Sequence, residues 1–201
     1  LAAYPELGCT GGPYEVMTTW GISKQIYCAG NPDTFTFWKT VLDEVCELFP
    51  SEYIHTGGDE APKTAWEKCP KCQQLMAETG AADEHMLQVH VTLEMEKHLA
   101  SKGRRLIGWD EIFEDGLSQT AAVMWWHKTK GVAIAEAGNG LVVAHSSSLY
   151  FDKYQSRDKA NQPLAIGGYV GIEKVYALDP IPEGLSPEAA NNVLGAQAQL
   201  W

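Results

Sequence analysis

Two neighbouring carboxylates, Asp59 and Glu60, are the side chains of this sequence that are best placed to do chemistry. They follow a short apolar run at 51–54 and the pair Gly57-Gly58. Glycine lets the backbone turn sharply and lets a ligand come close, because it has no Cβ. Paired acids at the end of a strand suggest proton transfer to and from a substrate. A structural alternative stands beside this one, in which Asp59 caps a helix and Glu60 is a first-turn acid that favours the helix dipole.

Unusual side chains also follow the later apolar runs. In chain order they are Trp109, Asp110 and Glu111, then Trp125 and Trp126, then Tyr150 and Asp152, and finally Trp201. Tryptophan faces suit the apolar C–H face of a sugar ring, and nearby carboxylates bind its hydroxyls. The pattern therefore predicts a carbohydrate-binding pocket. The alternative is that tryptophans fill the core, which we expect of Trp38 and Trp66 in helices and, from strand alternation, of Trp125.

These residues need structural elements that bring them to one edge, and apolar periodicity predicts such elements. Helices are expected at about 34–49, 63–79, 83–102 and 130–137, and strands at 51–56, 105–109, 121–126, 140–145 and 193–201. The first thirty residues are expected to form a long irregular loop. Short apolar strands that alternate with amphipathic helices indicate an α/β fold with a parallel sheet.

The clustering of unusual residues at successive strand ends favours a β/α barrel over a doubly wound sheet. A barrel places its active site at the C-terminal ends of its strands. A doubly wound sheet binds its ligand at a single switch point, often with a glycine-rich phosphate loop, and the sequence contains no G-x-G-x-x-G. The acids and the tryptophans are therefore expected at one face of a barrel.

Composition and charge narrow the class of protein. With 201 residues and 45% hydrophobic content, the chain can bury a core, and one domain is the default expectation. The net charge of -11 and the lack of a Lys/Arg cluster argue against a nucleic-acid partner. An acidic surface fits a neutral substrate. No apolar run approaches the roughly 20 residues that span a bilayer, so no membrane span is predicted.

The five cysteines leave several alternatives open. Cys46 lies at an apolar position of the expected helix and is assigned to the core. Cys69 and Cys72 form a C-x-x-C that fits half a zinc site, a redox pair or a loop staple. Because no second C-x-x-C or histidine pair lies at ligand spacing, we predict no metal and no cofactor. Cys9 and Cys28 are expected to form a disulfide if the protein is exported.

Several motifs occur along the chain in a fixed order. They are His55-x-Gly57-Gly58-Asp59-Glu60, Gly108-Trp109-Asp110-Glu111, Trp126, Tyr150-x-Asp152 and Leu200-Trp201. In combination they resemble the β-N-acetylhexosaminidases of glycoside hydrolase family 20, and the likeness runs across nearly the whole chain. The resemblance implies a (β/α)8 TIM barrel. It also implies a retaining, substrate-assisted glycosidase that removes terminal N-acetylglucosamine or N-acetylgalactosamine from glycans.

The resemblance assigns separate roles to the two acids. In substrate-assisted families the sugar supplies its own nucleophile, here the 2-acetamido carbonyl oxygen. Glu60 would protonate the leaving oxygen and then activate water, while Asp59 would orient the acetamido N–H and offset the developing positive charge. Tyr150 would donate a hydrogen bond to the acetamido oxygen. The remaining substrate-binding residues would enclose the sugar: Trp109, Trp126, Asp152 and Trp201. His55 is assigned a structural role within its strand.

The resemblance covers only part of a barrel. A full barrel has eight strands over roughly 250 residues, and the five strands expected here correspond to about the fourth through the eighth. We therefore expect residues 1–201 to be a partial catalytic domain, truncated at both ends and weakly active or inactive alone. Unpaired edges near 51–56 and 193–201 predict self-association. The family is commonly exported, so a periplasmic, outer-membrane-associated or secreted location is expected.

Two other classes of protein remain as alternatives. A non-catalytic carbohydrate-binding protein could use the same aromatic surface, but it would not need an adjacent acid pair and is usually an all-β sandwich. A zinc-dependent hydrolase could recruit Cys69, Cys72, His55 and Asp59, provided that these ligands converge in space.

Overall fold

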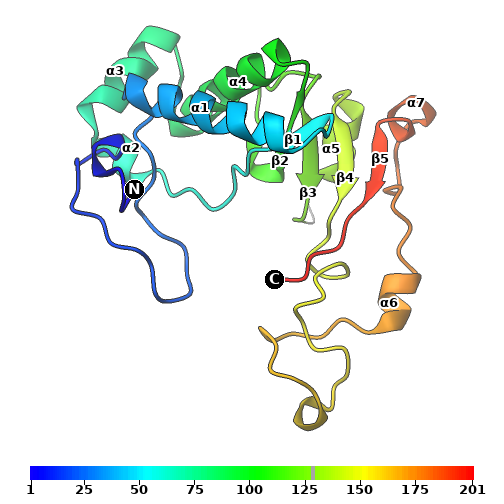
Figure 1. Cartoon of the computed structure of the whole chain (residues 1–201). Helices are drawn as coiled ribbons and strands as arrows, with labels where there is room; N and C mark the ends of the chain where they lie inside the picture. The colour runs from blue at the N-terminus through cyan, green and yellow to red at the C-terminus, as the bar shows by residue number, and fades with distance from the viewer. Residues whose placement is uncertain (128–129) are drawn as a thin grey trace. The chain divides into compact units, whose positions relative to one another are not determined.

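The computed structural model describes residues 1–127 and 130–201, which form two compact units (Figure 1). The N-terminal unit is Leu1–Ser118 and the C-terminal unit is Gln119–Trp201. The expectation of a single catalytic domain over 1–201 stays a prediction.

The N-terminal unit contains two parallel strands with three helices between them. Its elements are η1 (Pro5–Leu7), α1 (Pro32–Leu48), β1 (Tyr53–His55), α2 (Thr64–Lys68), α3 (Pro70–Thr79), α4 (Glu84–Ser101), β2 (Arg105–Trp109) and η2 (Asp110–Ile112). β1 pairs with β2 in parallel, with Tyr53 opposite Arg105 and His55 opposite Ile107. β2 is buried along most of its length, as expected of a parallel strand that is covered on both faces.

Two long helices form where the periodicity predicts them, and their first residues explain where they begin. The Asn31 side chain accepts a hydrogen bond from Asp33 N at the start of α1, and the Asp83 side chain accepts one from Met86 N at the start of α4. These N-caps satisfy backbone donors that the helix itself leaves free. Gly103, at φ +69, follows the end of α4 in the left-handed conformation that glycine adopts readily.

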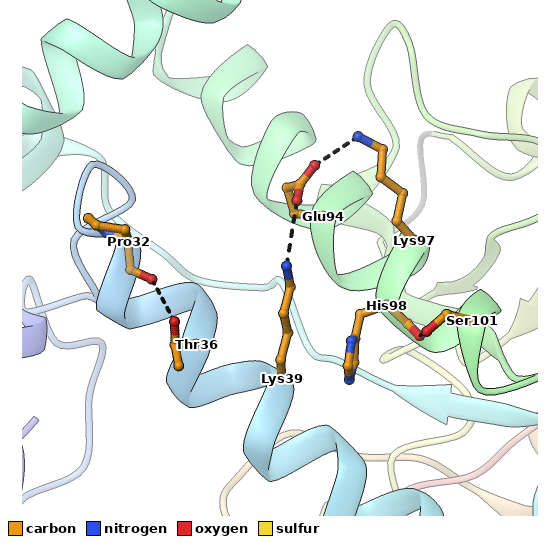
Figure 2. Close-up of polar contacts among 7 residues, drawn as sticks. All are labelled: Pro32, Thr36, Lys39, Glu94, Lys97, His98 and Ser101. Atoms are coloured by element: carbon orange, nitrogen blue, oxygen red, sulfur yellow. Dashed lines mark hydrogen bonds and ion pairs between the residues drawn. The ribbon is translucent and has the colours of Figure 1, made fainter.

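Polar contacts join α1 and α4 at their exposed margin. Lys39 of α1 lies 3.9 Å from Glu94 of α4, and Lys97 lies 2.8 Å from the same carboxylate (Figure 2). The hydrogen bond from Lys97 is the main reason that the pKa of Glu94 is lowered. Nearby, Asp43 contacts both His98 and Lys102. Because these groups lie at the surface and keep partial access to water, they add little to the stability that the apolar contacts provide.

The predicted helix at 63–79 is wrong as a single element, because it is broken at Cys69. α2 ends at Lys68, Cys69 is extended at φ -89 and ψ 115, and α3 begins at Pro70. Proline disfavours the helical conformation in the residue before it and has no N–H to donate to the preceding turn. The break turns Cys69 and Cys72 toward the interior, where both are buried.

The C-terminal unit is a three-stranded parallel sheet. Its elements are β3 (Ala122–Trp125), α5 (Gly131–Glu136), β4 (Gly140–Val143), η3 (Lys159–Asn161), α6 (Ile172–Tyr176), α7 (Pro187–Ala190) and β5 (Val193–Ala196). β4 pairs with β3 on one side and with β5 on the other. The pairing of β4 with β5 contains a register shift at Leu141/Val142. The helices α6 and α7 are not predicted from the sequence, because helices of four or five residues are too short to show a period of 3.6.

Candidate active site

The acid pair lies in the irregular segment that follows β1. Gly57 and Gly58 have φ values of +74 and +104, and Glu60 has φ +48. A non-glycine residue in the left-handed region is uncommon and is often found at functional sites. Trp109 N donates to Gly57 O over 2.9 Å, which ties this segment to the end of β2. We call residues 56–61 the acid turn.

The acid turn is held tightly against its surroundings. Gln88 of α4 donates through Nε2 to Gly58 O over 2.6 Å. A Cβ at Gly58 would lie 2.4 Å from Ile112 Cγ2, and a Cβ at Gly108 would lie 2.8 Å from Gly57 O. Both glycines are therefore required by close contact, and the backbone that carries the two acids is fixed by α4, β2 and η2.

Neither acid has the structural role that the helix-cap alternative gives it. α2 begins at Thr64 with Lys63 as its N-cap, so Asp59 does not cap a helix and Glu60 is not in a first turn. Asp59 is half-buried and Glu60 is exposed. Within the described residues, neither carboxylate accepts a hydrogen bond or joins an ion pair, so both are available to a ligand.

Two ionisable neighbours of the acid turn have shifted pKa values. The surrounding protein desolvates the imidazolium of His55 and lowers its pKa, although the negative charge of Asp59 opposes the shift. His55 Nδ1 accepts a hydrogen bond from Gly57 N over 3.0 Å, which requires that nitrogen to be unprotonated. Desolvation also lowers the pKa of Lys63, whose Nζ donates to Ala61 O and to Gln88 Oε1. His55 therefore supports the turn, as the sequence predicts.

The tryptophan at the end of β2 lies close to the acid turn. Trp109 is 9% exposed, and its ring lies edge-on to His55 with 5.1 Å between centroids. Asp110, the first residue of η2, is buried, and Glu111 is half-buried. The N-terminal unit thus brings Asp59, Glu60 and Trp109 to the C-terminal ends of its two parallel strands.

The C-terminal unit brings together Trp126 and Tyr150. Trp126 follows β3 directly, and its ring stacks on Tyr150 with centroids 6.2 Å apart at 24°. The backbone beside Tyr150 is fixed by Gln199, whose O accepts from Phe151 N and whose N donates to Leu149 O, each over 2.8 Å. These contacts hold the tyrosine at the end of the unit's sheet.

Two buried side-chain oxygens near Tyr150 lack a hydrogen-bond partner within residues 1–127 and 130–201. Asp152 Oδ1 and Gln199 Oε1 are both buried and accept no hydrogen bond from the residues that the structure describes. Such atoms are costly to bury unless a ligand or water satisfies them. Gln199 is not among the residues that the sequence predicts for the site. The feature of the sequence that could have indicated it is its position two residues before Trp201. Trp201 itself is 76% exposed.

Trp66 and Trp125 are core residues, as the sequence predicts, whereas Trp38 is only partly buried. Trp66 is buried and donates through Nε1 to Tyr27 O over 2.8 Å. Trp38 packs against the buried apolar cluster to which Trp66 belongs. Trp125 is buried, and a Cβ at Gly131 of α5 would lie 2.4 Å from its ring. Its ring therefore packs closely on the first turn of that helix.

With this geometry in view, comparison with known proteins decides the family. The sequence profile of the glycosyl hydrolase family 20 catalytic domain matches residues 1–201. The chain belongs to this family.

Curated and solved relatives agree with the family match. A β-hexosaminidase from Porphyromonas gingivalis is 45% identical over the whole chain, which covers 26% of that protein. A chitobiase from Flavobacterium johnsoniae has a TM-score of 0.84 at 28% identity, over 99% of this chain and 29% of its own. A family 20 exo-β-N-acetylglucosaminidase from Vibrio harveyi, solved with N-acetylglucosamine, has a TM-score of 0.74 at 28% identity, over 88% of this chain and 28% of its own.

The match confirms the predicted fold class, part of a (β/α)8 barrel. The chain spans 26%, 28% and 41% of three curated relatives that are named β-hexosaminidases.

The structure differs from the sequence-based expectations for the cysteines. All five are free thiols, so the Cys9–Cys28 disulfide expected of an exported protein does not form in this structure. Cys69 and Cys72 lie with Cys9 and Cys28. Among the described residues, His55 and Asp59 belong to no cluster that could hold a metal ion, which removes the support for the zinc-hydrolase alternative.

Proposed function

We propose that this protein is a retaining β-N-acetylhexosaminidase that cleaves terminal N-acetylglucosamine or N-acetylgalactosamine from glycans. The observation that carries the proposal is the acid turn of a family 20 catalytic domain, where Asp59 and Glu60 follow a parallel strand. Among the described residues, neither carboxylate accepts a hydrogen bond or joins an ion pair. Three curated relatives are named β-hexosaminidases, and one solved relative was crystallised with N-acetylglucosamine.

In the proposed reaction, the acetamido carbonyl oxygen of the substrate bonds to the anomeric carbon. The bond to the leaving oxygen breaks at the same time, and Glu60 gives its proton to that oxygen. Glu60, now a carboxylate, takes a proton from water, and the water oxygen attacks the anomeric carbon and releases the acetamido oxygen. Two inversions at one carbon retain its configuration. Asp59 balances the positive charge of the cyclic intermediate and accepts the acetamido N–H.

Most of the proposed sugar-binding residues belong to the C-terminal unit, and Trp109 belongs to the N-terminal unit. Tyr150 would donate a hydrogen bond from its hydroxyl to the acetamido oxygen. The stacking of its ring on Trp126 supports a fixed ring orientation. Asp152 would accept a hydrogen bond from a sugar hydroxyl through Oδ1, the buried oxygen that the described residues leave without a partner. Trp109, Trp126 and Trp201 would contact the apolar faces of the sugar and its acetamido methyl group.

The central experiment measures hydrolysis of aryl N-acetyl-β-glucosaminide and aryl N-acetyl-β-galactosaminide by the intact protein, and by residues 1–201 alone. Glu60→Gln keeps the size of the side chain but removes the acidic proton that the leaving oxygen needs. Glu67→Gln is the matched control, because Glu67 is an exposed carboxylate on α2 of the same unit. A thiazoline analogue of the cyclic intermediate should inhibit the intact protein.

The expected result is activity in the intact protein and in Glu67→Gln, and a severe loss in Glu60→Gln. Weak or absent activity is expected of residues 1–201 alone. An aryl β-glucoside, which lacks the acetamido group, is a further substrate. If it were hydrolysed as fast as the aryl N-acetyl-β-glucosaminide, substrate assistance would be contradicted. Wild-type kcat in Glu60→Gln would exclude that residue as the acid.

We also propose that the protein is exported and that residues 1–201 associate through the outer edges of β1 and β5. The location rests on the family resemblance alone. In the described parts of the chain, no helix is both long and apolar enough to cross a bilayer. The association rests on sheet edges, which expose backbone donors and acceptors to another chain.

A further inference from the structure

Four of the five cysteines meet in the N-terminal unit, although they come from three separate segments of the chain. Cys9 follows η1, Cys28 precedes α1, and Cys69 and Cys72 lie just before and within α3. Their four sulfur atoms all lie within 4.8 Å of one another. The nearest distances are 3.7 Å for Cys28–Cys69, 3.7 Å for Cys28–Cys72 and 3.9 Å for Cys9–Cys72.

These distances fit four thiolates around one metal ion. Zinc binds cysteine sulfur at about 2.3 Å in a tetrahedron, and the sulfur atoms of such a tetrahedron are about 3.8 Å apart. Two bonded sulfur atoms would be only about 2.0 Å apart. Three of the six sulfur–sulfur separations, at 3.7 to 3.9 Å, therefore match the edges of a metal-thiolate tetrahedron, and all six lie within 4.8 Å.

The backbone around the sulfurs is shaped to bring them together. Gly8 and Tyr27 form an antiparallel bridge, and Cys28 N donates to Leu7 O over 2.8 Å, so the segments that carry Cys9 and Cys28 run side by side. Gly30 then lies against the first turn of α3, where an added Cβ would be 2.1 Å from the Lys71 carbonyl carbon. Only a residue without a Cβ allows this approach.

Apolar side chains surround the cluster and shield most of it from solvent. Cys28, Cys69 and Cys72 are 1%, 3% and 0% exposed, and Cys9 is half-buried. Trp66, Leu87, Ala29 and Val91 belong to the same buried cluster, with Cys9, Ile26 and Phe35 packed against it. With four protein ligands and an apolar surround, a bound ion would have no open position for water or substrate, which is the mark of a structural site.

We propose that Cys9, Cys28, Cys69 and Cys72 bind one structural zinc ion as thiolates. Four sulfur ligands in a tetrahedron select zinc or iron among the common metals, and the closed apolar surround suits zinc, which needs no redox partner. The ion would fasten the glycine- and proline-rich segment before α1 to the start of α3. This inference stands independently of the proposed glycosidase activity, because none of the four cysteines has a role in that reaction.

The test is metal analysis of the intact protein, purified without a metal-binding tag or chelator after expression with added zinc. We expect about one zinc ion per chain. We expect Cys28→Ser and Cys72→Ser to lower that content to below about a tenth, because a hydroxyl is a poor zinc ligand. Cys46→Ser is the matched control, since Cys46 lies on α1 outside the cluster, and it should keep the full zinc content.

A second measurement on the wild-type protein covers the case in which the variants fail to fold. Removal of zinc and addition of Co²⁺ should produce the charge-transfer and d–d absorption of a tetrahedral cobalt-thiolate centre. Four thiols per chain should become reactive only after a strong chelator is added. Two disulfides by mass spectrometry, bound iron in place of zinc, or four reactive thiols with no metal would each overturn the proposal.

Discussion

The sharpest test of the acid turn is Gly58→Ala. Gly58 has φ +104, and an added Cβ would lie 2.4 Å from Ile112 Cγ2, which is closer than real Cβ contacts allow. The unusual backbone angle alone costs an alanine about 1–3 kcal/mol. The overlap with a buried side chain adds about 1–3 kcal/mol. We therefore expect the free energy of unfolding to fall by about 2–6 kcal/mol.

Gly80→Ala separates the backbone cost from the packing cost. Gly80 follows α3 at φ +72, and nothing lies within 4 Å of an added Cβ there. Its substitution should cost only the left-handed strain, about 1–2 kcal/mol. The assay is urea unfolding of the intact protein and of both variants. The quantity compared is the urea midpoint of the transition in which the N-terminal unit unfolds. Equal destabilisation by the two substitutions would refute the packing argument.

A double variant tests the contact itself. Ile112→Ala alone should destabilise by about 2–5 kcal/mol because it leaves a cavity. Combined with Gly58→Ala, it gives the new methyl group room, so the double variant should lose less stability than the sum of the two single variants. The same relief should appear in kcat/KM if the clash displaces Asp59 and Glu60, because a shift of about 1 Å in a catalytic group can cost about 100-fold. Strict additivity in both measurements would show that Ile112 does not restrain the turn.

The remaining predictions concern the acids, an ion-paired carboxylate and the sheet edges. Glu60→Gln should lower kcat by about 10²–10⁴-fold, and Asp59→Asn should lower kcat by about 10²–10³-fold with a smaller change in KM; near-normal kcat in Asp59→Asn would remove that residue from the mechanism. Hydrogen bonds from Lys102 and His98 lower the pKa of Asp43 from its ordinary 3.8. Its stabilising contribution is therefore present above that value and lost as pH falls through the lowered pKa. Asp43→Asn should consequently have a lower urea midpoint than wild type at pH 6, and the two should converge near pH 2; a constant difference across this range would contradict the assignment. Residues 1–201 alone should self-associate in light scattering as concentration rises, whereas a monomer at high concentration would count against pairing at β1 and β5.

Local sequence patterns were sufficient to predict most of the elements. α1, α4 and β2 lie where apolar spacing placed them, because an amphipathic helix and a buried strand each leave a periodic pattern. The break at Cys69 could have been predicted from Pro70, since the restriction that proline places on the preceding residue is also local. The short helices α6 and α7 carry too few residues for a period to be visible.

The candidate site was predicted in part for the same reason. The motifs at 55–60 and 108–111 are contiguous, so their residue types and their place after strands could be read directly from the sequence. The support that Gln88 and Ile112 give to Gly58 was not visible, because both are distant in sequence and are ordinary residues for their elements. The partnerless oxygens of Asp152 and Gln199 likewise depend on what surrounds them in space.

The sequence by itself determined the family, the order of the strands and of the longest helices, and the candidate acid pair, since these are encoded by neighbouring residues and by periods of two and 3.6. Only the tertiary structure showed that the acids cap no helix and that Cys9 and Cys28 complete a cluster with Cys69 and Cys72. A search at fixed ligand spacing could not find that cluster, because its sulfur atoms are brought together by the packing of the N-terminal loop on α3. Contacts between distant segments have no fixed spacing in the sequence, and the folded chain alone defines them.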